Sequence, residues 1–173
     1  MTKAEQLKTI IIGLGNPILC DDGVGPRAAR LIRERLNAEK LRVSDISVSE
    51  VYAGGIALLD KITGYDRAVI IDSIITGDNA PGTVYRLTPL SLAHTRNCGS
   101  SHDMTFPMAL DMGRMLGMSL PSEIHIWAIE AKDAFTFGEE LSVDVENSLP
   151  RVINDILSAC ISWNITAHER LSV

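Results

Sequence analysis

The chain has 173 residues, of which 46% are hydrophobic and 22% are charged, and its formal net charge is −6. This composition is typical of a globular protein, so we expect a single domain over residues 1–173 with one sizeable core. The acidic balance, with no cluster of Lys and Arg, argues against a nucleic-acid partner, and no apolar run approaches the roughly 20 residues that would predict membrane insertion.

Apolar β-branched runs alternate with amphipathic stretches along the chain, which predicts alternating strands and helices. The first strand is expected at residues 7–14. It leads through a glycine-rich turn into a helix at residues 23–38, where Pro26 fits only the first turn. The remaining strands are expected at residues 43–51, 68–71, 83–87 and 124–129, and the remaining helices at residues 56–62, 102–118 and 142–163.

Local signals predict several helix ends. Ser100 or Ser101 is the expected N-cap of the helix at residues 102–118, and Ser142 is the expected N-cap of the last helix. Pro150 should force a kink or a break in that last helix. Residues 88–101 are expected to be mostly loop.

This order of elements predicts a three-layer α/β/α sandwich with a mostly parallel, twisted five-stranded sheet. The strand at residues 83–87 alternates with period two and follows a short loop, so we expect a half-exposed, antiparallel edge strand. If the first and third strands are neighbours, their junction is a topological switch point, where open α/β proteins bind their ligands.

Three polar side chains are expected near this junction. Asp22 follows the first strand, Asp72 closes the third, and His102 opens the helix that leads to the fifth. Two carboxylates and one imidazole could ligate Ni, Zn, Mn or Fe, or could supply a general base and its partner. The alternative is that the acids only cap turns, although an acid among buried aliphatic residues, as at Asp72, needs a partner or a role.

Other patterns predict less. His94, Cys98 and His102 have the spacing of zinc ligands on a helix, but the intervening Asn and Gly residues argue against one continuous helix. Gly13 and Gly15 resemble the start of a dinucleotide-binding loop, yet the third glycine is missing and acids follow where a pyrophosphate would lie. Three separated cysteines argue against a disulfide framework and favour a reducing, cytoplasmic compartment.

The segment Gly13-Leu14-Gly15-Asn16-Pro17-Ile18-Leu19-Cys20-Asp21-Asp22-Gly23-Val24-Gly25 closely resembles the opening motif of the hydrogenase maturation proteases. The resemblance extends in order and spacing through Ile70-Ile71-Asp72-Ser73, Ala80-Pro81-Gly82-Thr83-Val84 and Ser100-Ser101-His102-Asp103-Met104. It implies a phosphorylase/hydrolase-like fold. It also implies an endopeptidase that removes the C-terminal extension of the large-subunit precursor of a NiFe hydrogenase.

The resemblance further implies that Asp22, Asp72 and His102 are both the catalytic and the metal-contacting residues. Asp21 would be a helper or a cap, and Gly54 and Gly55 would line the substrate cleft. The nickel is expected to be supplied by the precursor, so no resident cofactor is expected, although cadmium or zinc could occupy the same ligands in a crystal. Water activation by a carboxylate and polarisation of the scissile carbonyl by nickel both stay open.

Two alternative functions stay open beside the protease. A nickel-sensing maturation chaperone could use the same three ligands without cutting any bond. The Gly13-Leu14-Gly15-Asn16-Pro17 segment also resembles the start of peptidyl-tRNA hydrolase, but the residues that follow it differ and the catalytic His of that family is not found in the expected run. The acidic balance also disfavours a tRNA partner.

Overall fold

The computed structural model describes residues 7–38, 45–92 and 105–170, with side chains described as far as Trp163. Its strands are β1 (Thr9–Leu14), β2 (Ile46–Val51), β3 (Arg67–Ile74), β4 (Val84–Leu87) and β5 (Glu123–Glu130). Its helices are α1 (Val24–Ala38), α2 (Ile56–Ile62), α3 (Pro89–Leu92), α4 (Phe106–Met115) and α5 (Val143–Arg170), with a short 3-10 helix, η1 (Cys20–Gly23), before α1.

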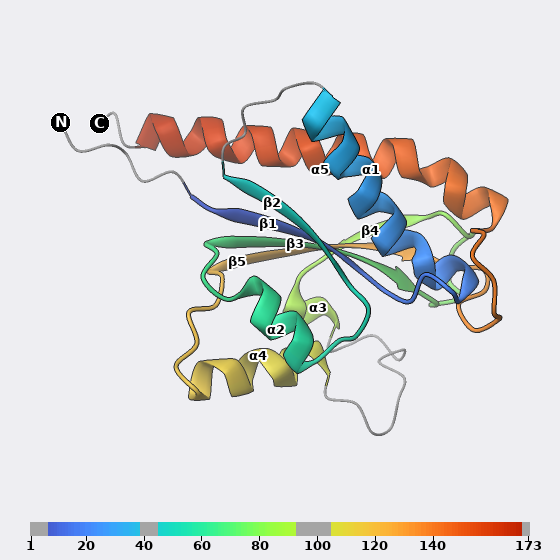
Figure 1. Ribbon diagram of the computed structural model, residues 1–173, viewed down its shortest axis with the longest axis horizontal. Coiled ribbons are helices and arrows are strands. Elements are labelled where there is room, and N and C mark those ends of the chain that lie inside the picture. Colours follow the sequence, from blue (N-terminus) through green and yellow to red (C-terminus); the bar gives the residue numbers. More distant parts are fainter. Residues whose placement is uncertain (1–6, 39–44, 93–104, 171–173) are drawn as a thin grey trace.

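The strands form one twisted sheet in the order β2-β1-β3-β5-β4 (Figure 1). All neighbours are parallel except β4, which pairs with β5 in the antiparallel sense at the edge. The predicted sheet is therefore confirmed, including the antiparallel edge strand. Because β1 lies between β2 and β3, the strand order reverses at the β1–β3 junction, and this junction is the switch point.

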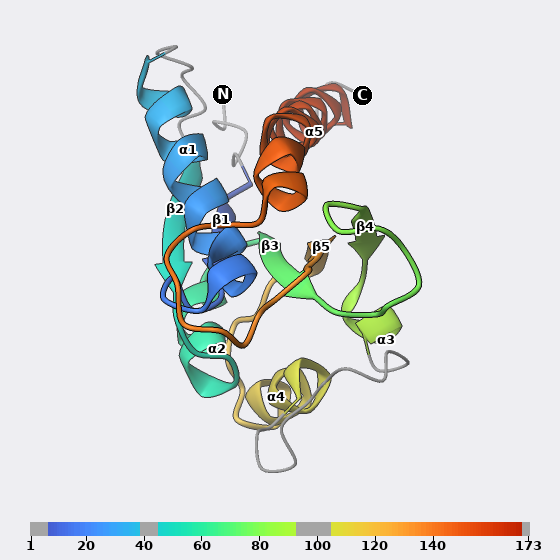
Figure 2. The same cartoon turned by 90° about the vertical axis from the view of Figure 1, so that its right-hand side faces the viewer.

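Helices cover both faces of the sheet, which confirms the three predicted layers. Helices α1 and α5 lie on one face, and α2, α3 and α4 lie on the other (Figure 2). Successive residues of β1 serve the two faces in turn: Ile11 belongs to the core under α1 and α5, whereas Ile10 and Ile12 belong to the core under α2 and α4. Both faces of β1 are therefore buried, as its β-branched sequence predicts.

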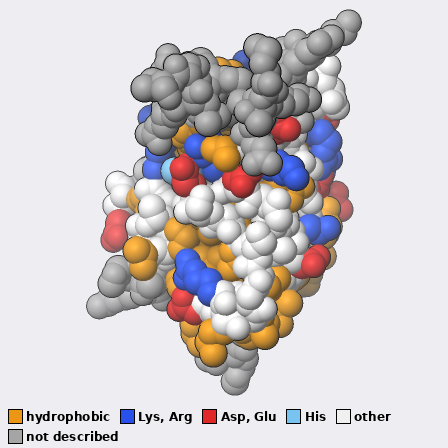
Figure 3. All heavy atoms as spheres, turned by 90° about the vertical axis from the view of Figure 1, so that its left-hand side faces the viewer, with side chains coloured by type: hydrophobic (Ala, Val, Ile, Leu, Met, Phe, Trp, Pro, Cys, Tyr) orange, Lys and Arg blue, Asp and Glu red, His pale blue; other side chains and the backbone are white. Residues whose placement is uncertain are grey.

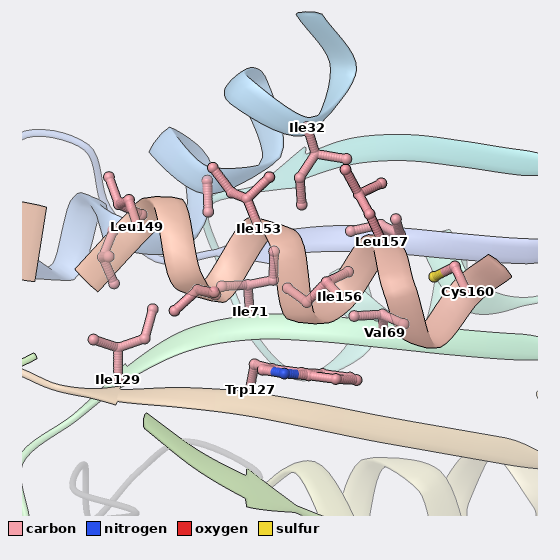
Figure 4. Packing of buried hydrophobic residues seen from close by; sticks show 14 of the residues in the cluster. Ile32, Val69, Ile71, Trp127, Ile129, Leu149, Ile153, Ile156, Leu157 and Cys160 are labelled. Atoms are coloured by element: carbon pink, nitrogen blue, oxygen red, sulfur yellow. The ribbon is translucent and has the colours of Figure 1, made fainter. Parts of the chain in front are cut away.

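The core under α5 is built from long apolar side chains (Figure 4). Ile156 of α5 lies beside Ile71 of β3, whereas Ile153 points toward α1, and Trp127 of β5, only 2% exposed, belongs to the same cluster. Burial of each such side chain contributes about 1.5–3 kcal/mol. The strands that end at the switch point are thus fixed on a rigid base.

Strand β3 is longer than predicted. It continues to Ile74, because its hydrogen-bonded register with β5 extends through Asp72 opposite Ala128 and Ile74 opposite Glu130. The sequence indicated that Asp72 closes the strand, but Asp72 lies inside it. Its side chain is still directed from the carboxyl-terminal half of the strand, near the switch point.

The predicted N-cap of α4 is wrong. The helix begins at Phe106, and Thr105 caps it by accepting a hydrogen bond from the Met108 N–H at 3.4 Å. Pro107 lies in the first turn, where its missing N–H costs nothing. The expected caps Ser100 and Ser101 lie outside the described residues.

Helix α5 follows Ser142, as predicted, and the Ser142 carbonyl accepts from the Glu146 N–H at 2.9 Å. The Ser142 hydroxyl, however, donates to Asp21 instead of capping the helix. The helix is continuous through Pro150, so the predicted break does not occur. No helix in the described part of the chain is both long enough and apolar enough to cross a membrane.

Candidate active site at the junction of β1 and β3

Glycines bring the loop after β1 close to the sheet. A Cβ at Gly25 would lie 2.1 Å from the Leu14 carbonyl oxygen and 2.4 Å from the Ile71 carbonyl oxygen, so only glycine lets the start of α1 sit on β1 and β3. Gly15 has a φ of +134°, and a Cβ there would lie 2.0 Å from the Asp22 carbonyl oxygen. The loop therefore folds back on itself and places Asp22 at the switch point.

Both carboxylate oxygens of Asp22 are held in place. Its Oδ2 accepts from the Asn16 N–H at 2.7 Å, and its Oδ1 accepts from the Ser73 hydroxyl at 2.8 Å. The side chain is only partly buried, so it stays accessible from solvent. Each oxygen keeps a second lone pair, which leaves Asp22 able to contact a cation while its orientation is fixed.

Asp72 is the second carboxylate at the junction. Its Oδ1 accepts from the Ser73 N–H at 2.9 Å, and among the described residues no donor reaches its Oδ2. Burial and the nearby charge of Asp22 raise the pKa of Asp72 to about 7, although the Ser73 N–H acts in the opposite direction. The structure thus brings the two predicted acids together, and Ser73 joins them.

Asp21 has a different role from its neighbour Asp22. It is fully buried, and its carboxylate accepts from the N–H groups of Lys132, Asp133 and Ser142 at 2.6–3.1 Å, and from the Ser142 hydroxyl at 3.0 Å. These donors all belong to the segment between β5 and α5. Through these hydrogen bonds, Asp21 anchors that segment to the loop that carries Asp22.

Strand β5 ends on a buried acid that was not among the predicted site residues. Glu130 is 2% exposed and accepts from Thr76 Oγ1 at 2.6 Å, Tyr85 OH at 2.8 Å and Gly77 N at 2.9 Å. Burial raises the pKa of Glu130, but these hydrogen bonds outweigh it and hold the pKa below its usual value. Glu130 thereby orders the loop after β3. The signal was present in the sequence as an acid at the end of a buried apolar run.

The other predicted site residues are His102, Gly54 and Gly55. His102 lies outside the described residues. Gly54 and Gly55 lie at the surface between β2 and α2, where an added Cβ would meet no atom within 4 Å, and their place in a substrate cleft stays a prediction. Cys20 lies next to the acids, and burial together with the charges of Asp133 and Asp21 raises the pKa of its thiol, so it stays protonated at neutral pH.

The donor set of the described site consists of two carboxylates. Asp22 and Asp72 supply carboxylate oxygens, but within the described ranges no group of three or more His, Cys, Asp or Glu side chains could hold a metal ion. A third ligand would have to come from the segment that includes His102, or from the partner that brings the metal. The described site alone is an open pair of carboxylates.

The sequence is similar to proteins of hydrogenase maturation. The family model HycI, described as hydrogenase maturation protease, matches residues 27–159, which is more than half of the chain. The hydrogenase expression/formation protein HupD of Thiocapsa roseopersicina is 24% identical over 165 residues, covering 93% of this chain and 71% of HupD. The hydrogenase 2 maturation protease of Escherichia coli K12 is 26% identical over 78 residues, 45% of each chain.

The fold is also similar to that of a solved structure. The hydrogenase maturating endopeptidase HybD from E. coli superposes with a TM-score of 0.70 at 21% identity, covering 90% of this chain and 93% of HybD. At this identity the likeness concerns the fold. The α/β architecture around the two acids is thus shared with that structure.

Proposed function

Because the chain belongs to the hydrogenase maturation protease family, we propose that it removes the C-terminal extension of the large-subunit precursor of a NiFe hydrogenase after nickel insertion. Membership makes the chain an endopeptidase. The identity of the precursor, the position of the cut and the role of nickel are the proposed part. The three separated cysteines support the cytoplasm as the compartment of this reaction.

One observation supports the proposal most strongly: Asp22, from the loop after β1, and Asp72, from the neighbouring strand β3, meet at one switch point and are joined there by Ser73. An open α/β sheet binds its ligands at such a junction. Two carboxylates at one junction attract a cation that the substrate carries. The protease would therefore recognise the precursor's nickel as part of its substrate.

The two acids are suited to different tasks. Asp22 is fixed through both oxygens, which favours a constant contact with the precursor's nickel. Asp72 keeps Oδ2 without a donor among the described residues, so this oxygen can accept a proton from the water that attacks the scissile carbonyl. Approach of a divalent cation lowers the pKa of Asp72 and keeps this carboxylate in the basic, ionised form. His102 is proposed as the third contact to nickel.

Nickel then acts as a signal that insertion is complete. Without it, two carboxylates at one junction repel each other and offer no attraction to the precursor's C-terminal region. With it, the cation neutralises that repulsion and draws the scissile segment toward Asp72. This provides a physical reason for cleaving only the nickel-loaded precursor.

Variants of the two acids test this proposal. Purified Asp22→Asn, Asp72→Asn and wild-type protein would be incubated with nickel-loaded precursor, and the released C-terminal fragment identified by mass spectrometry. We expect each variant to lose at least about 100-fold in kcat/KM, with Asp78→Asn, an exposed acid in the loop after β3, as the matched control.

Two results would contradict the proposal. Wild-type processing by both acid variants would remove the acids from the reaction. Nickel-dependent binding of the precursor by wild-type protein, without release of a fragment, would instead indicate the maturation chaperone.

A further inference from the structure

The segment between β5 and α5, residues 131–142, crosses the carboxyl edge of the sheet beside the loop after β1 (Figure 2). The two are joined directly: the Cys20 N–H donates to the Gly138 carbonyl at 2.7 Å, and the Gly138 N–H donates to the Ile18 carbonyl at 3.0 Å. Asp21 adds its hydrogen bonds to the same segment. The segment is thus a continuation of the candidate active site.

This well-anchored segment presents large apolar side chains to solvent. Phe135 and Phe137 are 80% and 81% exposed, and Ile18, from the loop after β1, is 47% exposed. Leu19 and Gly138 form a parallel β-bridge, which places Ile18 and Phe137 at neighbouring positions. We name these three residues, Ile18, Phe135 and Phe137, the apolar ridge. Exposed apolar groups that are clustered on an ordered backbone mark an interaction surface.

The exposure is not a result of a loose backbone. Asp133 Oδ1 accepts from the N–H groups of Phe135 at 2.9 Å and Thr136 at 3.0 Å, which fixes the turn that carries the first phenylalanine. The Asp21 N–H donates to the Asp133 carbonyl at 2.9 Å, so this turn is tied to the loop of the site. A phenylalanine side chain that stays in water gains no hydrophobic free energy. A partner that covers the ring removes its apolar surface from water and so gains that free energy on binding.

A hollow of about 650 Å³ adjoins the ridge and is acidic. Its lining includes the side chains of Asp133, Glu139 and Glu140, and no Lys or Arg is among its lining residues. A bound segment of the opposite charge would neutralise these carboxylates at the edge of the interface. The chemistry of the surface is therefore apolar on the ridge and negative beside it.

We propose that the apolar ridge and the acidic hollow form the docking surface for the hydrogenase large-subunit precursor, and that they receive a segment carrying a large apolar side chain next to Lys or Arg. This inference rests on the proposed function. Its occupant is argued from position, because the ridge lies on the segment that Asp21 anchors to the loop carrying Asp22, beside the candidate active site. It also follows from charge, since the hollow is lined by acids.

The test compares two matched pairs of substitutions. The ridge variant is Phe135→Ser with Phe137→Ser. The control is Met115→Ser with Leu116→Ser, since these residues, 88% and 70% exposed, end α4 at the opposite edge of the sheet. Hydrophobic side chains also gather on that end of the molecule (Figure 3), so the control removes equivalent apolar surface there. All four side chains are exposed, so both variants are expected to fold.

Binding and processing would be measured with nickel-loaded large-subunit precursors of the organism that encodes this chain. We expect the ridge variant to raise KM and the dissociation constant at least 10-fold with kcat within twofold of wild type, while the control changes neither. Glu139→Gln with Glu140→Gln should raise KM about threefold and weaken its dependence on salt. A precursor that binds the ridge variant as tightly as wild type would overturn the inference.

The outcomes separate this inference from the function on which it rests. Processing that depends on Asp22 but has an unchanged KM in the ridge variant overturns the docking surface alone. Binding through the ridge without cleavage overturns the protease and retains the surface. A wild-type dimer in sedimentation that becomes a monomer in the ridge variant would assign the ridge to a second copy of the chain and overturn the proposal.

Discussion

Ser73 Oγ donates to Asp22 Oδ1 at 2.8 Å, and this bond joins the third strand of the sheet to the loop after the first. The Ser73 N–H at the same time donates to Asp72 Oδ1 at 2.9 Å. One serine therefore orients both carboxylates of the candidate site. Neither oxygen contact needs a bound metal, so the pair is preorganised before a substrate arrives.

Removal of this hydroxyl should reduce turnover more than substrate binding. In Ser73→Ala, Asp22 keeps its bond from Asn16 but loses the one to Oδ1, and a hydrogen bond to a charged group is worth about 1.5–3 kcal/mol. We expect kcat to fall about 10-fold or more with KM within threefold. Ser73→Thr retains a hydroxyl and should restore most of the activity. Equal kcat values for Ser73→Ala and wild type would refute the positioning role.

The pKa of Asp72 predicts how stability depends on pH. In the folded protein the pKa is about 7, against an ordinary value of 3.8, so the folded state binds this proton more tightly than the unfolded state. The contribution to stability is complete below about pH 4 and is lost as the pH rises through 7. Asp72→Asn carries no such proton, so its stability relative to wild type should rise with pH.

Urea unfolding in the presence of a chelator at pH 5 and pH 8 measures this difference. Because one pKa unit corresponds to about 1.4 kcal/mol, we expect the unfolding free energy of Asp72→Asn to rise relative to that of wild type by about 2–3 kcal/mol between pH 5 and pH 8. Asp78→Asn, at an exposed position, serves as the control and should show no such rise. Parallel pH profiles for wild type and Asp72→Asn would contradict a raised pKa.

Asp21 should be important for stability. Asp21→Ala leaves the N–H groups of Lys132, Asp133 and Ser142 without their acceptor in the interior. An unsatisfied buried donor costs about 1–3 kcal/mol, so we expect a loss of at least about 3 kcal/mol and a decrease in Tm of about 6–12 °C. Asp78→Ala should lower the Tm by less than about 2 °C. Calorimetry that gives both variants the same Tm would show that the anchor is dispensable.

The close approach of α1 to the sheet predicts a sharp difference between two glycines. Gly25→Ala would place a Cβ 2.1 Å from the Leu14 carbonyl oxygen, and backbone atoms on both strands prevent relaxation, so we expect a loss of about 3 kcal/mol or more. Gly54→Ala meets no atom within 4 Å and should change stability by less than about 0.5 kcal/mol. Similar chemical denaturation midpoints for the two variants would contradict the packing described for Gly25.

The sequence was sufficient to predict the sheet because its signals were local and mutually consistent. The β-branched run of residues 10–12 demands burial on both faces, and the alternation of strands and helices then requires a parallel sheet with helices on each side. The short loop before residues 84–87 likewise indicated the antiparallel edge. These features depend on residue type and spacing alone.

The division of labour between Asp21 and Asp22 could not be derived from spacing. Both follow the same strand, and only the 3-10 turn of η1 directs Asp21 into the interior and leaves Asp22 at the surface of the junction. The donors that satisfy Asp21 lie more than 100 residues away in the chain, as the bond from Ser142 shows. Long-range hydrogen bonds of this kind have no sequence signature.

Asp72, Ser73 and Glu130 illustrate a second limit. The sequence placed Asp72 at the end of its strand, but pairing with β5 extends the strand past it, because tertiary pairing overrides the local signal. The roles of Ser73 and Glu130 depend on which loops fold back over the sheet. An acid at the end of a buried run was the available clue for Glu130, since a buried carboxylate requires hydrogen-bond donors.

Recognition of nickel by Asp22 and Asp72 is tested most directly with one precursor in two states, nickel-loaded and nickel-free. Nickel-loaded and nickel-free large-subunit precursor would be incubated separately with the wild-type protein and with Asp22→Asn, and the C-terminal fragment identified by mass. We predict release of the fragment only from the nickel-loaded precursor and only by the wild-type protein. Equal cleavage of the nickel-free precursor, or full cleavage by Asp22→Asn, would contradict recognition of nickel by these carboxylates.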